Sequence, residues 1–542
     1  MKIADDAAVG RPIHRNVLLV LIDDLRDVRH SPSLTPSLIA LASESLSFTR
    51  HYSALSSCAP ARTALLTGRR PDATRSWDLH TYWRDEGTTQ IPSLPQFLRA
   101  HGYRTIGIGK VFHPNHASGL LNASQPGGPR EDQDGLFSWS EPFWRVPEAT
   151  LLALERAVNR TSWLSVPSSM GLTLPDELIA DRAVHELHRL ERRAGEPFFL
   201  AVGFVRPHLP LVAPASSFAA ASAAMANAAL HAPTPLPPRG MPRMAWHGSG
   251  ELTNHLDVAA AAGTPIGRPL SPTGPRIAPH TSHALRLAYA AAAHHVDEQL
   301  GKVLGSLRRS SFGNQTVTVL TSDHGFGLGE RGLWGKHTNF DVALRVPLLL
   351  RAPMLQLPVA RHAAAYTEHV DIFPTVVMLA TGERLEQCSR GSSSMTPNVC
   401  VDGVALVEPA THGGLRMRST PRAIAAAFSQ HPASPAGRAK PSPCLSPSGC
   451  TMGYSVATRL EDGHGYRLTL WVRFQTAPDW ERVLASELYN YSESDQAPSA
   501  GTEVADGVLG SMASAEVFNR HGEHAYSRVE RRLTGMLRRG IG

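Results

Sequence analysis

The sequence predicts an α/β fold in which helices cover both faces of a large, mostly parallel sheet. Three features indicate this fold: short apolar segments that end in polar side chains, amphipathic segments between them, and a length of 542 residues, which exceeds one ordinary domain. Beyond about residue 410 the composition changes, and we expect a smaller subdomain with an antiparallel sheet and a helix. The predicted division is residues 1–415 for the N-terminal domain and residues 416–542 for the C-terminal α+β subdomain.

Four apolar segments have the length and composition of strands that are buried on both faces. They occupy residues 16–24, 103–110, 197–208 and 315–325. The chemically capable side chains at their ends are Asp23, Asp24, Lys110, His208, Asp323 and His324. Because ligands gather at the carboxyl edge of open α/β sheets, we expect these side chains to lie near one another.

Amphipathic helices are predicted between these strands, at residues 35–45, 93–102, 178–193 and 285–309. Residues 231–280 are rich in Pro, Gly and Ala, which favours a long surface excursion rather than a further domain. Near the C-terminus, alternating apolar residues around a DGHG turn predict a β-hairpin over residues 452–474. A final helix is predicted over residues 525–539.

The composition restricts the classes of function. Hydrophobic residues make up 42% of the chain and charged residues 18%, which is typical of a globular protein. Lys and Arg exceed Asp and Glu by 6, but they are scattered, so we expect no nucleic-acid partner and at most a mild preference for an anionic substrate. The apolar runs at residues 17–22 and 346–350 are too short for a membrane span, so none is expected.

The sequence also bears on cellular location. The opening residues, MKIADDAAVGRPIHRN, lack the apolar segment of a signal peptide. Four N-x-S/T sequons nevertheless occur, at Asn122, Asn159, Asn314 and Asn490. If they carry glycans, the chain has lost its leader, and we expect a protein of the secretory pathway, lysosomal or extracellular.

Five cysteines divide into two close pairs and one remainder. Cys388 and Cys400 are twelve residues apart and Cys444 and Cys450 six apart, so both pairs could close small disulfides. Cys58 is left over, and an unpaired cysteine is most often a small buried hydrophobe.

The surroundings of Cys58 favour a different role. It precedes a predicted helix with Pro60 in its opening turn, where a missing N–H costs little. The free N–H groups and the dipole of the helix start favour an anion, and Arg62 adds a cation that can fork onto oxygens. Further basic side chains that follow strands or lie in glycine-rich loops are Lys110, His113, His208 and Lys336. Together they predict an anion-binding site.

A metal site is expected beside it. Asp23 and Asp24 would point to opposite faces of a regular strand, but a turn there would bring both to one cation. With Asp323 they form an oxygen-rich set suited to Ca²⁺ or Mg²⁺. His324 is a borderline ligand for such hard ions. Solvated acids at strand ends remain the alternative interpretation of each residue alone.

The sequence C-x-P-x-R followed by TGRRPD resembles the signature of the type I sulfatases, in which the cysteine becomes formylglycine. Further similar segments are LIDDLR, TYWR, GKVFHP, PFFLAVGFVRPHLP and TSDHGFGLGERGLWGKHTNFDVALRVPL. The resemblance extends from about residue 15 to about residue 495. It implies the alkaline-phosphatase-like α/β sandwich with a smaller C-terminal subdomain and makes residues 1–415 the catalytic domain. Two positions, Phe326 and His337, depart from the aromatic residues of the family pattern.

The resemblance also implies roles for single residues. One Ca²⁺ ion would be bound by Asp23, Asp24, Asp323 and His324. Cys58 would become a hydrated aldehyde, one hydroxyl of which attacks sulfur while Arg62 and the ion hold it as an anion. His113 would deprotonate the second hydroxyl, so that the aldehyde reforms and sulfate leaves. A serine at this position could form the sulfate ester but would lack that second hydroxyl.

The remaining expectations concern the substrate. Lys110, His208 and Lys336 would neutralise the sulfate oxygens, and His208 or Lys336 would protonate the departing sugar oxygen. The motifs are most similar to those of sulfatases that act on the 2-O-sulfate of a terminal uronate in a glycosaminoglycan. A formylglycine-generating enzyme would mature the protein, and the 388/400 pair matches a disulfide of the family. The alternatives are another sulfated sugar, phosphodiester or phosphonate monoester hydrolysis, and sulfated-glycan binding with Cys58 unmodified.

Overall fold

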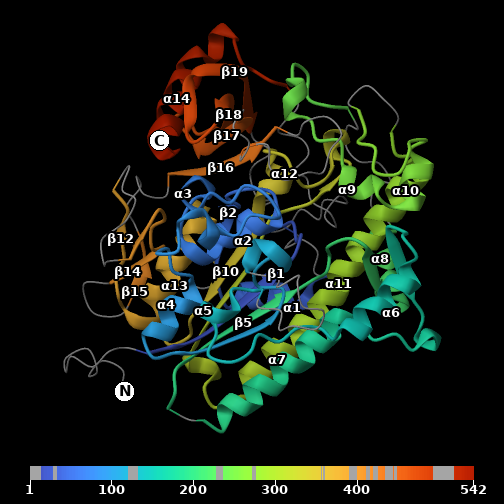
Figure 1. Ribbon diagram of the computed structural model, residues 1–542, viewed down its shortest axis with the longest axis vertical. Helices are drawn as coiled ribbons and strands as arrows, with labels where there is room; N and C mark the ends of the chain where they lie inside the picture. Colours follow the sequence, from blue (N-terminus) through green and yellow to red (C-terminus); the bar gives the residue numbers. More distant parts are fainter. Residues whose placement is uncertain are drawn as a thin grey trace.

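A seven-stranded sheet forms the centre of the computed structural model (Figure 1). The structure describes residues 14–27, 33–119, 132–193, 195–226, 236–271, 276–355, 357, 361–389, 399–409, 415–418, 425–433, 444, 449–491 and 518–541. The strand order is β11-β2-β10-β7-β1-β5-β3, and β10 alone runs against its neighbours. The strands are β1 Asn16–Ile22, β2 Leu46–Tyr52, β3 Arg104–Gly109, β5 Phe198–Phe204, β7 Thr316–Ser322, β10 Arg345–Arg351 and β11 Arg361–Glu368.

The four strands predicted from the sequence are confirmed and form one contiguous parallel block, β7-β1-β5-β3. Their register places their ends side by side: Ile22 at the end of β1 pairs with Ser322 of β7 and with Phe204 of β5. The residues that follow these strands therefore leave the sheet at the same edge. This common edge is the physical basis of the site described below.

The sheet separates two hydrophobic cores. Along β1, Val17 and Leu19 contribute to one core and Leu18 and Val20 to the other, because successive side chains of a strand point to opposite faces. Figure 1 shows α2, α4 and α13 on one side of the sheet and α7 and α11 on the other. These helices are α2 Cys58–Thr67, α4 Leu94–Ala100, α7 Pro175–Glu191, α11 Pro279–Arg309 and α13 Ile372–Thr381. The predicted three-layer α/β sandwich is confirmed.

All four predicted intervening helices are present, as α1 Pro36–Ser43, α4, α7 and α11. The remaining helices of the larger part are α3 Pro71–Thr74, α5 Gly135–Ser138, α6 Glu148–Val158, α8 Ala215–Met225, α9 Gly250–Thr253, α10 Leu256–Ala261 and α12 Asp341–Leu344. Two-stranded sheets pair β4 Trp163–Val166 with β6 Leu211–Pro214, β8 Gly327–Leu328 with β9 Trp334–Gly335, β12 Glu386–Gln387 with β13 Cys400–Val401, and β14 Val407–Pro409 with β15 Leu415–Met417. In the described segments, no helix is long and apolar enough to cross a bilayer.

The C-terminal unit is a four-stranded antiparallel sheet with one helix against it, at the top of Figure 1. Its elements are β16 Ala426–Pro432, β17 Cys450–Arg459, β18 Gly465–Phe474, β19 Pro478–Tyr491 and α14 Ser527–Ile541. The predicted hairpin and final helix are thus confirmed, and Leu533 and Leu537 of α14 are fully buried against the sheet. Both predicted disulfides, Cys388–Cys400 and Cys444–Cys450, are present.

The excursion at residues 231–280 differs in part from its prediction. It is not a separate domain, as expected, but its middle is not confined to the surface. Leu252 of α9 and Val258 of α10 are buried in the same core as α11. The segment therefore packs against the body of the protein, and this brings one of its acidic side chains to the site.

Two glycines allow the ends of β3 and β5 to approach closely. A Cβ added at Gly203 would lie 1.9 Å from the carbonyl oxygen of Lys110, and one at Gly109 would lie 2.2 Å from that of Gly203. Both contacts are with backbone atoms, which cannot move aside without distorting the strand ends. The position of Lys110 at the sheet edge therefore depends on glycine at position 203.

We expect Gly203→Ala to lower the free energy of unfolding by about 1–3 kcal/mol, because the new methyl group must displace the Lys110 backbone. Chemical denaturation measures this loss. Gly135→Ala is the matched control, since a Cβ there meets nothing within 4 Å and should change stability by less than about 0.5 kcal/mol. Equal denaturation midpoints for the two variants would contradict the steric explanation.

Candidate active site

The turn after β1 brings two adjacent carboxylates to one point. Asp24 adopts a left-handed conformation with φ 59°, so the chain leaves the strand direction there. Its backbone N–H donates to Asp323 Oδ1 at 3.0 Å, and the N–H of Leu25 donates to Ser322 Oγ at 3.0 Å. The turn predicted from the sequence is therefore present, and it is fastened to the end of β7.

Cys58 is the first residue of α2, and every side chain of this helix is buried. Its Sγ lies 3.3 Å from His324 Nε2, 3.4 Å from Lys336 Nζ and 3.9 Å from Lys110 Nζ. Burial raises the pKa of the Cys58 thiol, and the two lysines only partly offset this rise. An unmodified Cys58 is therefore a protonated thiol rather than an activated thiolate.

Arg62, one turn further along α2, ties three strand ends together. Its Nη2 donates to Asp23 Oδ1 at 2.8 Å and its Nε to Asp323 Oδ2 at 2.9 Å. Its Nη1 donates to the carbonyl oxygens of Lys110 and Val111. The guanidinium is fully buried, so it acts on the site chiefly by fixing these carboxylates and the end of β3.

Two lysines complete the ion pairs around Cys58. Lys110 Nζ contacts Asp23 Oδ2, while Lys336 Nζ lies 3.0 and 3.1 Å from the two oxygens of Asp24. Burial disfavours the charge of Lys336, but Asp24 and then Cys58 raise its pKa well above the usual value. Both side chains are therefore positioned as fixed cations beside the cysteine.

The loop that carries Lys336 is fastened to the residue two positions before Cys58. Ser56 Oγ donates to the carbonyl oxygen of Thr338 at 2.7 Å and accepts from the Thr338 N–H at 2.9 Å. The His337 N–H donates to the Ser56 carbonyl at 3.0 Å. This pairing of remote segments places the Lys336 side chain over the start of α2.

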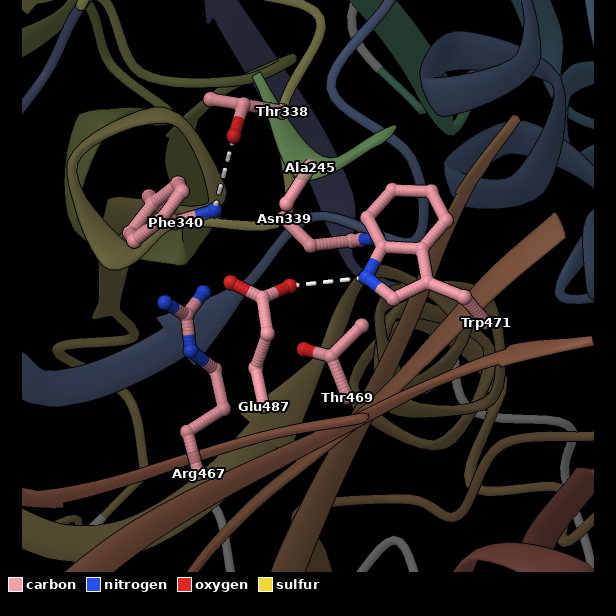
Figure 2. A pocket seen from close by; sticks show the side chains of 8 residues that line it. All are labelled: Ala245, Thr338, Asn339, Phe340, Arg467, Thr469, Trp471 and Glu487. Carbon is pink, nitrogen blue, oxygen red and sulfur yellow. Dashed lines mark hydrogen bonds between the residues drawn. The ribbon is translucent and has the colours of Figure 1, made fainter. Parts of the chain in front are cut away.

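The C-terminal sheet supports the same loop from outside. Asn339 Nδ2 donates to the Gly453 carbonyl of β17 at 3.1 Å. Figure 2 shows the pocket between the loop and strands β18 and β19, in which Glu487 lies between Arg467 and Trp471 and accepts from Trp471 Nε1 at 2.8 Å. The smaller subdomain thus supports the loop that carries Lys336.

The rings of the two predicted histidines, His208 and His113, differ in their hydrogen-bond partners. His208 Nδ1 lies 2.6 Å from the Leu209 carbonyl, so this nitrogen carries the proton and Nε2 is left as an acceptor. Burial, followed by Lys336 and Lys110, lowers the pKa of His208 to about 3. His113 lies in the loop after Lys110, and burial and then Lys110 hold its pKa well below the usual value. Within the described ranges, its Nδ1 has no hydrogen-bond partner.

The predicted metal ligands fall in two overlapping sets rather than in one. Two overlapping sets have ligand atoms within 4.8 Å of one another: Asp23, Asp24, Cys58 and His208, and Asp24, Cys58, Asp323 and His324. His324 Nδ1 lies 3.1 Å from the Gly325 carbonyl, which leaves Nε2 as the lone pair that faces the cluster. Three buried carboxylates and one oriented imidazole fit a divalent cation, and burial raises the pKa of Asp24 well above its usual value without one.

Sequence reasoning missed one charged residue at this site, Glu251 of α9. Its Oε1 lies 3.4 Å from Lys336 Nζ and 3.5 Å from His208 Nε2. Burial would raise the pKa of Glu251, but Lys336 and His337 hold it well below the usual value. No local pattern marks this residue, because its partners come from remote loops and the surrounding segment lacks helical periodicity.

The strand order of the central sheet and the helices on both of its faces define an alkaline-phosphatase-like α/β fold. Two solved structures share this fold. A phosphonate monoester hydrolase from Silicibacter pomeroyi has a TM-score of 0.59 and 22% identity, and the match covers 97% of this chain and 94% of that one. A protein solved in complex with its substrate D-glucosamine-2-N,6-O-disulfate has a TM-score of 0.62 and 17% identity, and the match covers 97% of each chain. The predicted fold is confirmed.

The sequence comparisons give the family. A family model described as Sulfatase matches residues 15–382. Iduronate 2-sulfatase of Homo sapiens is 31% identical over 535 residues, which cover 88% of this chain and 88% of that protein. The chain belongs to the sulfatase family and is a sulfuric ester hydrolase, as the resemblance implied.

We expect Arg62→Lys to destabilise the fold by about 3–5 kcal/mol, because an ammonium group cannot reach both Asp23 and Asp323 and leaves a buried carboxylate unpaired. Chemical denaturation with and without divalent cation measures the loss. The matched control is Arg532→Lys, which alters an exposed pair with Glu461 and should change stability by less than about 0.5 kcal/mol. Wild-type stability of Arg62→Lys would contradict the proposed role of the buried ion pairs.

Proposed function

We propose that this sulfatase hydrolyses the 2-O-sulfate of a terminal uronate in a glycosaminoglycan or a related sulfated polysaccharide. The observation that carries the reaction is the position of Cys58 at the start of α2, between buried carboxylates and the ammonium groups of Lys110 and Lys336. The support for the uronate is the 31% identity to human iduronate 2-sulfatase over 88% of both chains.

The proposal includes two groups that the chain's own residues would hold. Asp23, Asp24, Asp323 and His324 would bind one Ca²⁺ ion, and Cys58 would be converted to formylglycine. The ion would supply Lewis-acid polarisation, and the hydrated aldehyde would supply a hydroxyl nucleophile with a second hydroxyl for release of sulfate.

The surrounding residues would bind and orient the ester. Lys110 and Lys336 would hold the sulfate oxygens, since both ammonium groups already face Cys58. Arg62 would keep the carboxylates and the cysteine side chain in register. His113 would accept a proton through the unpartnered nitrogen of its ring. Of the two predicted acids, Lys336 would donate a proton to the departing sugar oxygen, because the structure leaves His208 Nε2 as an acceptor.

Maturation and location are part of the same proposal. Conversion of Cys58 requires a formylglycine-generating enzyme as partner. Two disulfides and the exposed sequons at Asn159 and Asn314 favour the secretory pathway, with a lysosomal or extracellular destination. The sequon at Asn122 lies outside the described residues, and Asn490 is half-buried. We also retain residues 1–415 as the catalytic domain and 416–542 as the C-terminal subdomain.

The test of the substrate is a panel of defined saccharides. Protein produced together with a formylglycine-generating enzyme should release sulfate from a disaccharide that ends in a 2-O-sulfated uronate, and much less from rings sulfated at other positions. Preference for another ring position would contradict the uronate. Faster turnover of an aryl phosphodiester than of an aryl sulfate would instead support the phosphodiester or phosphonate reaction.

Mass spectrometry of the peptide that contains Cys58 should show loss of the thiol mass and gain of an aldehyde. Cys58→Ser should then lose at least about 10³-fold in turnover, because the second hydroxyl is missing. The control is Ser140→Ala, a change away from the cysteine that should retain activity. An intact thiol in fully active protein would contradict the proposed nucleophile. An intact thiol in protein without turnover would instead favour a glycan-binding role.

Removal of the ion should abolish activity and lower the melting temperature by several degrees. An ion held at about 1,000 times its dissociation constant contributes roughly 4 kcal/mol of stability, which chelation removes. Added Ca²⁺ should restore both properties in the wild type but not in Asp24→Asn. Asp85→Asn, at an exposed position, should behave like the wild type. Full activity in excess chelator would count against the metal site.

A further inference from the structure

The proposed chemistry leaves one charged side chain at the site without a role. Glu251 Oε1 lies 3.4 Å from Nζ of Lys336, the candidate donor to the departing oxygen, and 3.5 Å from Nε2 of His208. Its Oε2 lies 3.8 Å from His337 Nε2 and has no hydrogen-bond partner in the part of the chain that the structure describes. These separations exceed ordinary hydrogen-bond lengths, so the carboxylate retains capacity to accept a hydrogen bond.

Glu251 also lies further out than the groups around Cys58. Its side chain is 30% exposed, whereas that of Lys336 is 2% exposed and that of Asp24 is fully buried. The Glu251 side chain therefore reaches solvent beside the buried ammonium group of Lys336. A sugar ring whose ester oxygen meets His208 and Lys336 would lie beside this carboxylate, because both side chains contact it.

Histidines from three segments surround the same point. The rings of His247 and His337 have centroids 4.9 Å apart, and those of His337 and His431 are 5.7 Å apart. His247 comes from the excursion, His337 from the loop after β9, and His431 from β16 of the C-terminal sheet. Glu251 is thus the single acidic side chain that contacts this group among the described ion pairs.

We propose that Glu251 is a specificity-determining residue: it accepts a hydrogen bond from the hydroxyl on the ring carbon next to the sulfate-bearing carbon and excludes rings that carry a second sulfate there. The inference rests on the proposed function, since it takes the ester oxygen to lie between His208 and Lys336. Both of these side chains contact Glu251, so the neighbouring ring substituent falls closest to its carboxylate.

The physical chemistry of a carboxylate supports this selectivity. A hydroxyl group donates a short, charge-assisted hydrogen bond to a carboxylate. A second sulfate offers no proton and brings a like charge against a half-buried carboxylate, where repulsion is screened less than in open solvent. A site built to bond a substrate hydroxyl also discriminates strongly against the analogue that lacks it, because its own polar group is left unpaired.

The first test compares two substrates that differ only at the neighbouring position: a disaccharide ending in a 2-O-sulfated uronate and its 2,3-di-O-sulfated counterpart. The wild type should prefer the monosulfated ring, and Glu251→Gln should reduce the ratio of the two kcat/KM values at least tenfold, roughly the effect of 1.4 kcal/mol. Glu251→Asp retains the charge and should retain discrimination against the disulfated ring. Glu155→Gln, on the exposed side of α6, is the control and should keep the wild-type ratio.

The second test is a double-mutant cycle with a 3-deoxy substrate. Removal of the hydroxyl should lower kcat/KM at least tenfold in the wild type but less than threefold in Glu251→Gln, because the variant has already lost the charged acceptor. If Glu251 served only in folding, the substitution would lower kcat/KM equally for both substrates, and the cycle would show no coupling energy. Circular dichroism and thermal unfolding establish that each variant is folded.

The outcomes separate the inference from the function on which it rests. An unchanged mono- to disulfated ratio in folded Glu251→Gln, or absence of coupling to the hydroxyl, would overturn the role of Glu251 while leaving the sulfatase reaction intact. Hydrolysis of an aryl sulfate, which carries no neighbouring hydroxyl, reports the sulfatase chemistry alone. If the wild type cleaves neither the aryl sulfate nor the saccharides, the proposed function and this inference are overturned together.

Discussion

The buried contact between Arg62 and two aspartates is the interaction on which the site depends. Asp23 and Asp323 follow neighbouring parallel strands, so their carboxylates would repel each other across the sheet edge. The Arg62 guanidinium pairs with both carboxylates and also donates hydrogen bonds to two backbone carbonyl groups just after β3. It thereby joins helix α2, which carries Cys58, to three strands of the central sheet.

Charge balance explains why so many ionic groups tolerate burial together. The three aspartates around Cys58 are matched by Arg62, Lys110 and Lys336, and Glu251 adds one further negative charge. A divalent cation would change the net charge of this set from −1 to +1. The single negative charge of a sulfate ester would then neutralise it. The electrostatics therefore favour simultaneous occupation by a cation and a monoanionic ester over occupation by either alone.

Much of this arrangement could be predicted from the sequence, because parallel strands that are buried on both faces leave a continuous apolar run and share one carboxyl edge. That reasoning located Asp23, Lys110 and Asp323. It did not establish the direction of β10, since an apolar run has the same pattern in either orientation. Glu251 was not found either, because tertiary contacts rather than local periodicity bring its short helix to the site.

The C-terminal sheet is part of the catalytic architecture rather than an appendage. Strand β16 bonds to the backbone just before α2, where the Gln430 N–H donates to the Ala54 carbonyl at 2.9 Å. Ser429 Oγ donates to the Ser53 carbonyl at 2.7 Å. Residues far apart in the chain thus close over the segment that leads to Cys58, and α2 has no exposed side chain once they have done so.

This burial sets an order of events during biosynthesis. Cys58 is only 2% exposed in the folded chain, beneath loops that come from positions some three hundred to four hundred residues later. An enzyme that oxidises this side chain needs its own active site in contact with the sulfur, and the finished fold offers no such access. Any such oxidation must therefore precede completion of the fold, while the C-terminal half of the chain has yet to dock.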